Sequence, residues 1–274
     1  MARDFRTIDV AGMRQYMARH GERDYVLVDV RQPDEYLKGH IPGSVLLPLA
    51  ELPARMAELP PDRDVFFYCR SGKRSQAAAI FLAAQPREAG EVYTMDGGML
   101  AWNGEVLTQA PNLHVFDLAG SDRDLLLRAM NLERGAERLY TAIGARHGGL
   151  PWGAHLAGLA GAEEGHAHMI YRFWAEGQVD PPTFAEVYAG LAGDLVEGGL
   201  SVAELMTVLE AQPLSPCRAV VEMALTVEYG AYDVSRTMAH HFRGQPLEAM
   251  LASIAEAERL HMRQAAEALT LCGD

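Results

Sequence analysis

The chain has 274 residues, of which 49% are hydrophobic and 22% are charged, so a largely disordered protein is excluded. Acidic side chains outnumber basic ones 37 to 24, and the resulting charge of −13 is the opposite of what a general nucleic-acid-binding protein needs. No apolar run approaches the ~20 residues of a membrane helix, no signal-peptide core is present, and three cysteines do not make a disulfide framework. We therefore expect a soluble cytoplasmic protein with reduced thiols, and no nucleic-acid or membrane partner.

The charge is unevenly distributed along the chain. Residues 1–110 carry 13 basic and 15 acidic side chains, whereas residues 111–274 carry 11 and 22. The stretch between 108 and 120 contains proline, glycine and several polar residues, as linkers do. This predicts a first domain over residues 1–108, a linker over 109–120 and a second domain over 121–274.

The first domain alternates strand and helix signals. Apolar runs at 26–30 and 65–68 are rich in β-branched and aromatic residues, as buried parallel strands are. A helical stretch over 75–84 follows the second run. The pattern predicts an α/β fold with a parallel sheet.

Cys69 ends the second of these strands and precedes a helix, where α/β folds bind ligands. The helix N-terminus and three nearby cations favour a thiolate over a thiol and would also hold an anionic sulfur group. A structural cysteine beside solvated charges is the alternative interpretation. We predict that Cys69 is the catalytic residue. The residues predicted to bind substrate are Arg70, Ser71, Gly72, Lys73, Arg74 and Ser75.

Three motifs in the same order make residues 1–108 resemble a single-domain rhodanese. They are segments 28–31, 35–36 and 39–43 taken together, the loop 69–75, and segment 97–102. The resemblance implies sulfur transfer through a persulfide on Cys69. It does not identify the donor or the acceptor, for which we expect thiosulfate or a persulfide and a thiol. Tyrosine-phosphatase-type enzymes have an arginine six positions after the cysteine, where this chain has Ser75, so phosphatase chemistry is disfavoured. Asp29 and Arg31 are expected to pair near the loop, in a structural or a direct role, whereas Gly97 and Gly98 are expected to serve turns and packing.

The second domain has the pattern of a helical bundle. Cap and breaker residues delimit helices over 121–148, 151–177, 215–244 and from 246 onward, with a further helical piece over 201–211. Two helical hairpins joined by a long crossover describe one class of four-helix bundle.

A shift of 95 residues superimposes the two hairpins, which therefore look like copies of one unit. The shift lays Glu133 over Glu228, and the pair Glu163 and His166 over Glu258 and His261. Each E-x-x-H pair lies on one helix face. In each hairpin the glutamate of the first helix lies 16 residues from the turn, and the glutamate of the E-x-x-H pair lies 14 residues from it on the second helix. At ~1.5 Å per residue these two distances are similar, so all six side chains are expected to meet at one level.

Four glutamates and two histidines in a bundle core suit two metal ions. We expect iron first, with manganese or zinc as alternatives; a solvated acidic helix face is the competing interpretation. Residues 121–270 resemble the ferritin-like superfamily, and the rubrerythrin-type domain most closely. The resemblance implies that the metal ligands are Glu133, Glu163, His166, Glu228, Glu258 and His261.

Other residues of this domain have weaker or mixed signals. Tyr140 matches a tyrosine often found near such sites, and a plain core position is equally open. Leu225 and Ala231 stand where rubrerythrin has a further glutamate, and the paired Cys-x-x-Cys of its rubredoxin part is missing, so an external protein has to donate electrons. We expect Cys217 to be a small buried residue and Cys272 to lie at a frayed terminus. The remaining histidines of this region, His147, His155, His168, His240 and His241, are not expected to be ligands.

Together these observations predict a homodimeric sulfurtransferase whose ferritin-like di-iron domain acts on oxygen, peroxide or a sulfur species. Two alternatives remain at this point. One is a persulfide- or metal-responsive sensor with little turnover, and the other is a metal-free bundle that serves only for dimerisation.

Overall fold

The computed structural model describes residues 4–104, 106–107, 111, 113–116, 121–211 and 217–272. The chain divides into two compact units, Met1–Ala110 and Pro111–Asp274. Most of the predicted linker and the predicted helix start at Ser215 lie outside the described residues. In the described part of the chain, none of the helices has the length and apolar composition of a membrane-spanning segment.

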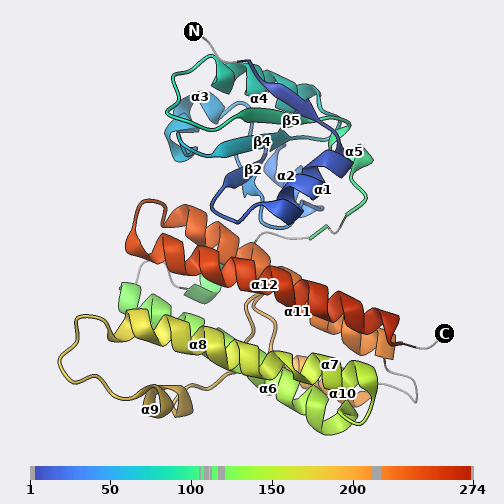
Figure 1. Cartoon of the computed structure of the whole chain (residues 1–274), viewed down its shortest axis with the longest axis vertical. Coiled ribbons are helices and arrows are strands. Elements are labelled where there is room, and N and C mark those ends of the chain that lie inside the picture. Colours follow the sequence, from blue (N-terminus) through green and yellow to red (C-terminus); the bar gives the residue numbers. More distant parts are fainter. Residues whose placement is uncertain are drawn as a thin grey trace. The chain divides into compact units, whose positions relative to one another are not determined.

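The first unit is built on a parallel sheet with the strand order β1-β5-β4-β2-β3 (Figure 1). The strands are β1 (Arg6–Ile8), β2 (Tyr25–Asp29), β3 (Val45–Leu46), β4 (Asp64–Tyr68) and β5 (Val92–Met95). The predicted parallel α/β fold is confirmed, with β4 in the centre. The helices are α1 (Val10–Arg19), α2 (Pro33–Leu37), α3 (Leu52–Arg55), η1 (Met56–Glu58), α4 (Lys73–Ala83) and α5 (Gly98–Ala101).

The sheet is buried on both faces, which explains its continuous apolar strands. Successive side chains of a strand point to opposite faces. Accordingly, Val26 and Val28 of β2 pack in a cluster with Leu82 of α4, whereas Leu27 packs in another cluster with Met13 of α1. The two layers hold the central strand rigidly and leave its carboxyl end to carry the Cys69 loop.

The second unit is a bundle in which α6 pairs with α8 and α11 pairs with α12 (Figure 1). Its helices are η2 (Leu113–Phe116), α6 (Asp122–His147), α7 (Pro151–Ala157), α8 (Leu159–Ala175), α9 (Phe184–Ala189), α10 (Val202–Ala211), α11 (Cys217–His241) and α12 (Pro246–Thr270). Helix α6 begins, as predicted, at a capping box between Ser121 and Asp124. The predicted second helix is interrupted at Gly158, and α9 is not predicted from the sequence.

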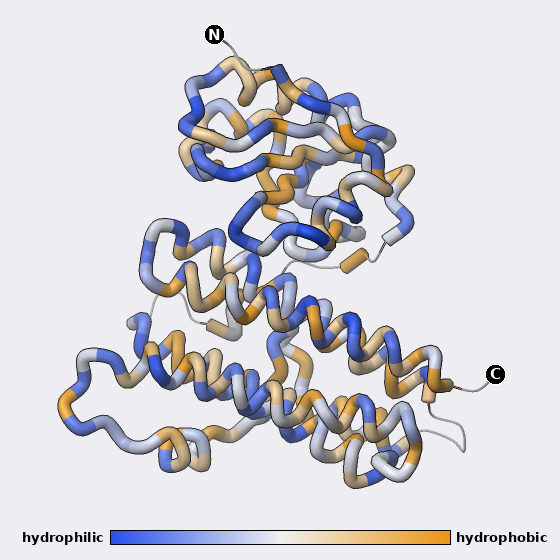
Figure 2. The backbone as a smooth tube through the Cα atoms, in the orientation of Figure 1, coloured by the Kyte–Doolittle hydropathy of each residue, from blue (hydrophilic) through white to orange (hydrophobic). Residues whose placement is uncertain are grey.

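Apolar residues of the bundle form two clusters, one on each side of a charged layer. Met130, Ala167, Val234 and Ile254 belong to the first cluster. Their counterparts in the second cluster are Leu139, Leu159, Val227 and Ala265. Figure 2 shows hydrophobic and hydrophilic residues alternating along these helices, as amphipathic helices require. Between the two clusters in sequence lie the buried residues Glu133, Glu163, His166, Glu228, Glu258 and His261.

The crossover between α8 and α11 contains a narrow hairpin at residues 194–202. Leu195 pairs antiparallel with Ser201, and the Val196 N–H donates to the Leu200 carbonyl at 3.0 Å. The hairpin touches both α6 and α11 at glycines. A Cβ on Gly135 would collide with the Leu195 carbonyl.

The expectation of reduced thiols is wrong for two of the three cysteines. Cys217, at the start of α11, and Cys272, just after α12, form a disulfide with a Cα–Cα distance of 5.5 Å. The antiparallel course of the two helices brings these residues within bridging distance although 55 residues separate them. Cys272 is therefore tied down, whereas Cys69 is free and buried.

Candidate functional site

The Cys69 side chain lies at the base of a tight loop between β4 and α4. It is only 1% exposed. Gly72 immediately precedes α4 and has a φ of 93°, a left-handed conformation that favours glycine. The Gly72 N–H points at Cys69 and donates to its Sγ at 3.2 Å. The loop therefore turns its backbone amides toward the sulfur.

These amides control the ionisation of Cys69. Burial acts to raise the pKa of the thiol, but hydrogen bonds from Ser75 and from the Ser71 and Gly72 amides outweigh it, so the pKa is lowered. Hydrogen bonds to a thiolate stabilise the charged form. The site therefore favours the nucleophilic form of the cysteine.

The predicted role of the loop cations needs a correction. The Arg74 guanidinium donates to both carboxylate oxygens of Glu35, at 2.6 and 2.7 Å. This ion pair lowers the pKa of Glu35 to about 2. Arg70 and Lys73 are exposed to solvent. Amide hydrogen bonds are thus the main stabilisers of the thiolate, and Arg74 adds an electrostatic interaction with Cys69 although it is paired with Glu35.

Ser75 links the loop to the sheet. Its hydroxyl donates to the Gly72 carbonyl at 2.9 Å and accepts a hydrogen bond from the Thr94 hydroxyl at 2.9 Å. Ser75 is fully buried. Of the six residues predicted to bind substrate, Ser75 therefore acts on the loop from inside, whereas Arg70, Ser71 and Lys73 face solvent.

Segment 97–102 supports the loop from behind. The Met99 N–H donates to the Cys69 carbonyl at 2.8 Å, and the Leu100 N–H donates to the Arg70 carbonyl at 3.0 Å. Gly98 has a φ of 54°, and a Cβ there would collide with the Cys69 carbonyl. The predicted packing role of this glycine is thus explained by the close approach of two backbone segments.

The expected pair of Asp29 and Arg31 is formed and buried. The Arg31 guanidinium donates to Asp29 at 2.6 Å and to the Gly39 carbonyl at 2.7 Å. The pair thereby holds segment 39–43 against the end of β2, which is a structural role.

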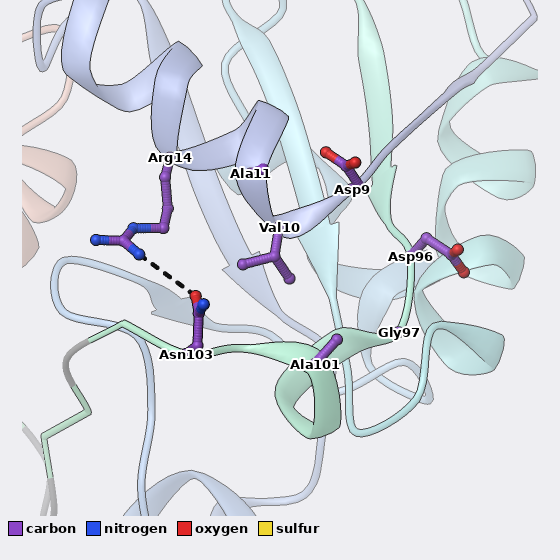
Figure 3. A pocket seen from close by; sticks show the side chains of 8 residues that line it. All are labelled: Asp9, Val10, Ala11, Arg14, Asp96, Gly97, Ala101 and Asn103. Atoms are coloured by element: carbon purple, nitrogen blue, oxygen red, sulfur yellow. Dashed lines mark hydrogen bonds between the residues drawn. The ribbon is translucent and has the colours of Figure 1, made fainter.

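A pocket of about 380 Å³ opens beside the loop, at the carboxyl ends of β1 and β5 (Figure 3). Asp9 and Asp96 lie on one side of it, and on the other side the Arg14 side chain donates to the Asn103 side-chain oxygen at 3.3 Å. Gly97 also lines the pocket and adjoins the loop, since a Cβ on Gly72 would lie 3.4 Å from its nitrogen. Cys69 itself does not line this pocket.

A nucleophilic cysteine at the end of the central parallel strand, cradled by the amides of a strand–loop–helix turn, defines a class of α/β domains that carry groups on sulfur. The sequence model of the rhodanese-like domain matches residues 13–105. A sulfurtransferase from Allochromatium vinosum is 43% identical over 95 residues, covering 35% of this chain and 85% of that protein. The chain therefore belongs to the rhodanese-like family through its first unit.

Two further similarities concern the same unit. The thiosulfate sulfurtransferase GlpE of Pseudoalteromonas translucida is 42% identical over 81 residues, which cover 30% of this chain and 75% of that protein. The crystal structure of a rhodanese-related protein from Thermoplasma volcanium is 27% identical and is matched over its whole length and 38% of this chain, with a TM-score of 0.34.

The second unit brings six predicted side chains together in the charged layer of the bundle. His166 Nδ1 lies 3.3 Å from Glu133, 3.3 Å from Glu163 and 3.0 Å from Glu258. The repeat supplies a matching arrangement on the other side. His261 Nδ1 lies 3.2 Å from Glu163, 3.3 Å from Glu228 and 3.3 Å from Glu258.

The arrangement is close to two-fold symmetric. Among the six distances given above, Glu163 and Glu258 approach both imidazoles, whereas Glu133 approaches His166 and Glu228 approaches His261. The result is two adjacent donor sets, each with one nitrogen and three carboxylates, of which two are shared.

The donor atoms of this cluster fit metal ions. Both Nδ1 atoms are buried without a hydrogen-bond partner, and so are oxygens of Glu133, Glu228 and Glu258. One donor atom from each of Glu163, His166, Glu258 and His261 lies within 4.8 Å of the others. Buried polar atoms left unpaired are costly, whereas a cation between them would satisfy all of them at once.

The pKa shifts of the cluster are also consistent with metal binding. Burial raises the pKa of Glu133 to about 8 and that of Glu228 well above its ordinary value. Burial acts to lower the pKa of His261, but the surrounding glutamates raise it to about 12. A metal ion bound by these groups would replace the protons that such pKa values favour, so metal binding would release protons.

Two further buried polar side chains of the bundle have to be considered together with this cluster. The Tyr140 hydroxyl donates to Glu228, and its ring is fully buried in the second apolar cluster, so the residue is both a core residue and a neighbour of the charged layer. Glu197, on the crossover hairpin, is 4% exposed, and one of its oxygens is buried without a partner. Sequence reasoning missed Glu197 because it has no counterpart under the repeat and lies on no helix.

Proposed function

We propose that the first unit is a sulfurtransferase that carries a persulfide on Cys69. The observation that supports this proposal most directly is the set of amide hydrogen bonds at the sulfur, including the one from Gly72. These hydrogen bonds lower the pKa of the Cys69 thiol. The sulfurtransferase relatives support the same chemistry.

In the first half-reaction the Cys69 thiolate attacks the outer sulfur of thiosulfate. A bond forms between the two sulfurs, the donor S–S bond breaks, and its electron pair leaves with sulfite. The loop amides then stabilise the anionic terminal sulfur, and exposed Arg70 and Lys73 supply positive charge for the anionic donor. In the second half-reaction an acceptor thiolate attacks that terminal sulfur, and the electron pair of the Cys69–sulfur bond returns to Cys69.

The test is the Cys69→Ser variant of the full chain, assayed with thiosulfate and either cyanide or a thiol as acceptor. We expect sulfurtransfer to fall to background because a hydroxyl cannot carry the sulfane sulfur. Cys217→Ser is the matched control and should retain activity, since its sulfur is engaged in the disulfide. Wild-type turnover in Cys69→Ser would refute the proposal.

We further propose that the second unit is a ferritin-like domain that holds two metal ions, iron first. The two donor sets around His166 and His261, with their unpartnered buried atoms, support this assignment. Two bound iron ions would supply one-electron redox chemistry toward oxygen, peroxide or a sulfur species. The chain's own part is to orient both imidazoles with shared carboxylates, to shield them between two apolar clusters, and to hold the Tyr140 proton at Glu228. Electrons would come from a separate donor protein.

Metal analysis of protein purified without added metal tests this second proposal. We expect about two ions per chain, lost together when His166 and His261 are both replaced by alanine. A metal content near zero in the unaltered protein, combined with no binding of ferrous iron on titration, would leave the bundle as a scaffold.

A further inference from the structure

The crossover hairpin delivers a buried carboxylate to the charged layer from outside the four long helices. Its backbone rests on α6 at Gly135 and on α11 at Gly230, where a Cβ would lie 3.3 Å from the Gly198 Cα. These two glycines are related by the repeat, and each stands two residues after a ligand, Glu133 or Glu228. Glu197 lies between the two contacts and therefore at the level of those ligands.

The side chain of Glu197 is buried, and one of its oxygens is not satisfied inside the protein. It is 4% exposed, and its Oε1 has no hydrogen-bond partner. Burying such a carboxylate is unfavourable unless a cation or a donor compensates it. Burial, and then the carboxylates of Glu133 and Glu258, raise the pKa of Glu197 well above its ordinary value. Tyr140 occupies the side of the cluster at Glu228, so the side left for Glu197 is that of Glu133 and His166.

The opposite side of the cluster is built differently. There the Tyr140 hydroxyl donates to Glu228. The shift of 95 residues lays Ser235 over Tyr140, so the repeat supplies no second phenol at this position. The nearly symmetric cluster thus receives a carboxylate on one side and a phenol on the other.

We propose that Glu197 is a further ligand of the dinuclear site, an oxygen donor to the metal ion held by His166 and Glu133. The inference rests on the metal-binding function proposed above and goes beyond it, because it makes the two metal positions unequal. The ion on the His261 side keeps one nitrogen and three carboxylates, whereas the ion on the His166 side gains a fourth carboxylate.

The additional charge has a consequence for redox chemistry. The four repeat-related glutamates balance the charge of two divalent ions when both imidazoles are neutral. Glu197 adds one buried negative charge, which is balanced when one of the ions is trivalent. It therefore favours the oxidised site, and Glu197→Gln should raise the reduction potential.

The test uses the full chain, freed of metal and titrated anaerobically with ferrous iron against a competing chelator. Glu197→Gln keeps the shape of the side chain, and we expect it to weaken the binding of one of the two ions by about 10-fold or more. Glu164→Gln is the matched control, because it removes the same charge from an exposed neighbour of Glu163 and should leave both affinities unchanged.

Two backgrounds identify the affected ion. In His261→Ala protein the better retained ion lies on the His166 side, and adding Glu197→Gln should weaken it. In His166→Ala protein the retained ion lies on the other side, and the same addition should have no effect. Equal effects in both backgrounds, or none in either, would overturn the inference.

Failure of the inference is distinguishable from failure of the proposed function. If the unaltered protein binds no iron, both fail. If it binds two ions and Glu197→Gln matches it in both affinities and in potential, only the role of Glu197 fails. Should Glu197→Gln not fold, as judged by helical circular dichroism, Glu197→Asp carries the test. Aspartate keeps the charge, but its shorter side chain moves the carboxylate oxygens away from the metal site. The binding of the same ion should therefore weaken, and an unchanged affinity would overturn the inference.

Discussion

At the scale of single residues, the Cys69 loop depends on a close approach that only glycine allows. Gly98 combines a φ of 54° with backbone contacts to Cys69 and Arg70. We expect Gly98→Ala to push the loop amides away from the sulfur and to reduce sulfurtransfer by about 100-fold, as a displacement near 1 Å can. Initial rates with thiosulfate measure this effect.

Gly177→Ala is the control for backbone strain. Gly177 also has a positive φ, of 73°, but a Cβ there meets nothing within 4 Å. This variant should lose a little stability and no sulfurtransfer activity. Equal activity of the two variants would show that the contact behind the loop is dispensable.

The ligand histidines can be separated from their neighbours in the same way. We expect His166→Ala to weaken metal binding by about 10-fold or more, because it removes a nitrogen donor from the cluster. His168 is exposed and stacks edge-on against Phe184 at 4.7 Å, away from the cluster, so His168→Ala should bind metal normally. Chelator competition with ferrous iron compares the two, and similar losses would contradict the assignment.

At the scale of elements, the disulfide joins the start of α11 to the end of α12. A cross-link closing 55 residues stabilises a fold by about 2–4 kcal/mol, since it restricts the unfolded chain. We therefore expect a reductant to lower the unfolding temperature of the bundle, and Cys272→Ser to lower it equally. Thermal unfolding with and without reductant measures this effect.

A thiol titration provides the independent check on that bridge. Under denaturing conditions one thiol per chain, that of Cys69, should react before reduction, and all three cysteines should react after it. If a reductant leaves the unfolding temperature of the unaltered protein unchanged, the disulfide does not stabilise the bundle.

The elements also show what can be predicted from sequence. Strands β2 and β4, the capping box at Ser121 and the six clustered side chains are predictable, because each depends on local spacing or on the repeat. The disulfide is not predictable, because it depends on two helix ends meeting across 55 residues. Nor is Glu197, because the tight hairpin that carries it follows no helical or strand period.

The break at Gly158 and the ion pair of Arg74 with Glu35 are further differences between expectation and structure. Both arise from tertiary context. Helices α7 and α8 follow one another along a nearly continuous helical pattern, and Glu35 is 39 residues away from Arg74 in the sequence. A charge count along the loop therefore overestimates the positive charge free to act on Cys69.

At the scale of the whole molecule, stability should depend on pH when metal is removed. The folded pKa of Glu133 is raised by burial from 4.5 to about 8, and that of His261 rises from 6.5 to about 12. Stability from a group whose pKa is higher in the folded state is present below its unfolded pKa and is lost as the pH rises through its folded pKa. The metal-free protein should therefore lose stability progressively from about pH 5 to pH 12, the contribution of Glu133 being lost by about pH 8 and that of His261 over the whole range above about pH 6.5.

Bound metal should suppress this dependence, because the ions replace the protons. The decrease in unfolding temperature caused by a chelator should thus grow between about pH 6 and pH 9. Thermal unfolding at several pH values, with and without chelator, measures the difference. A chelator effect that is absent, or that shrinks as the pH rises, would show that these six side chains do not hold metal.

The repeat within the bundle has a last consequence, for the evolution of the chain. A pair of identical hairpins related by a two-fold axis must carry the same residue at both equivalent positions. Once both copies belong to one polypeptide, each position can mutate alone. Tyr140 differs from its counterpart Ser235, and Glu197 lies on the single crossover segment, where the repeat gives it no counterpart. Joining the two copies in tandem is what allows the paired sites to become specialised for different tasks.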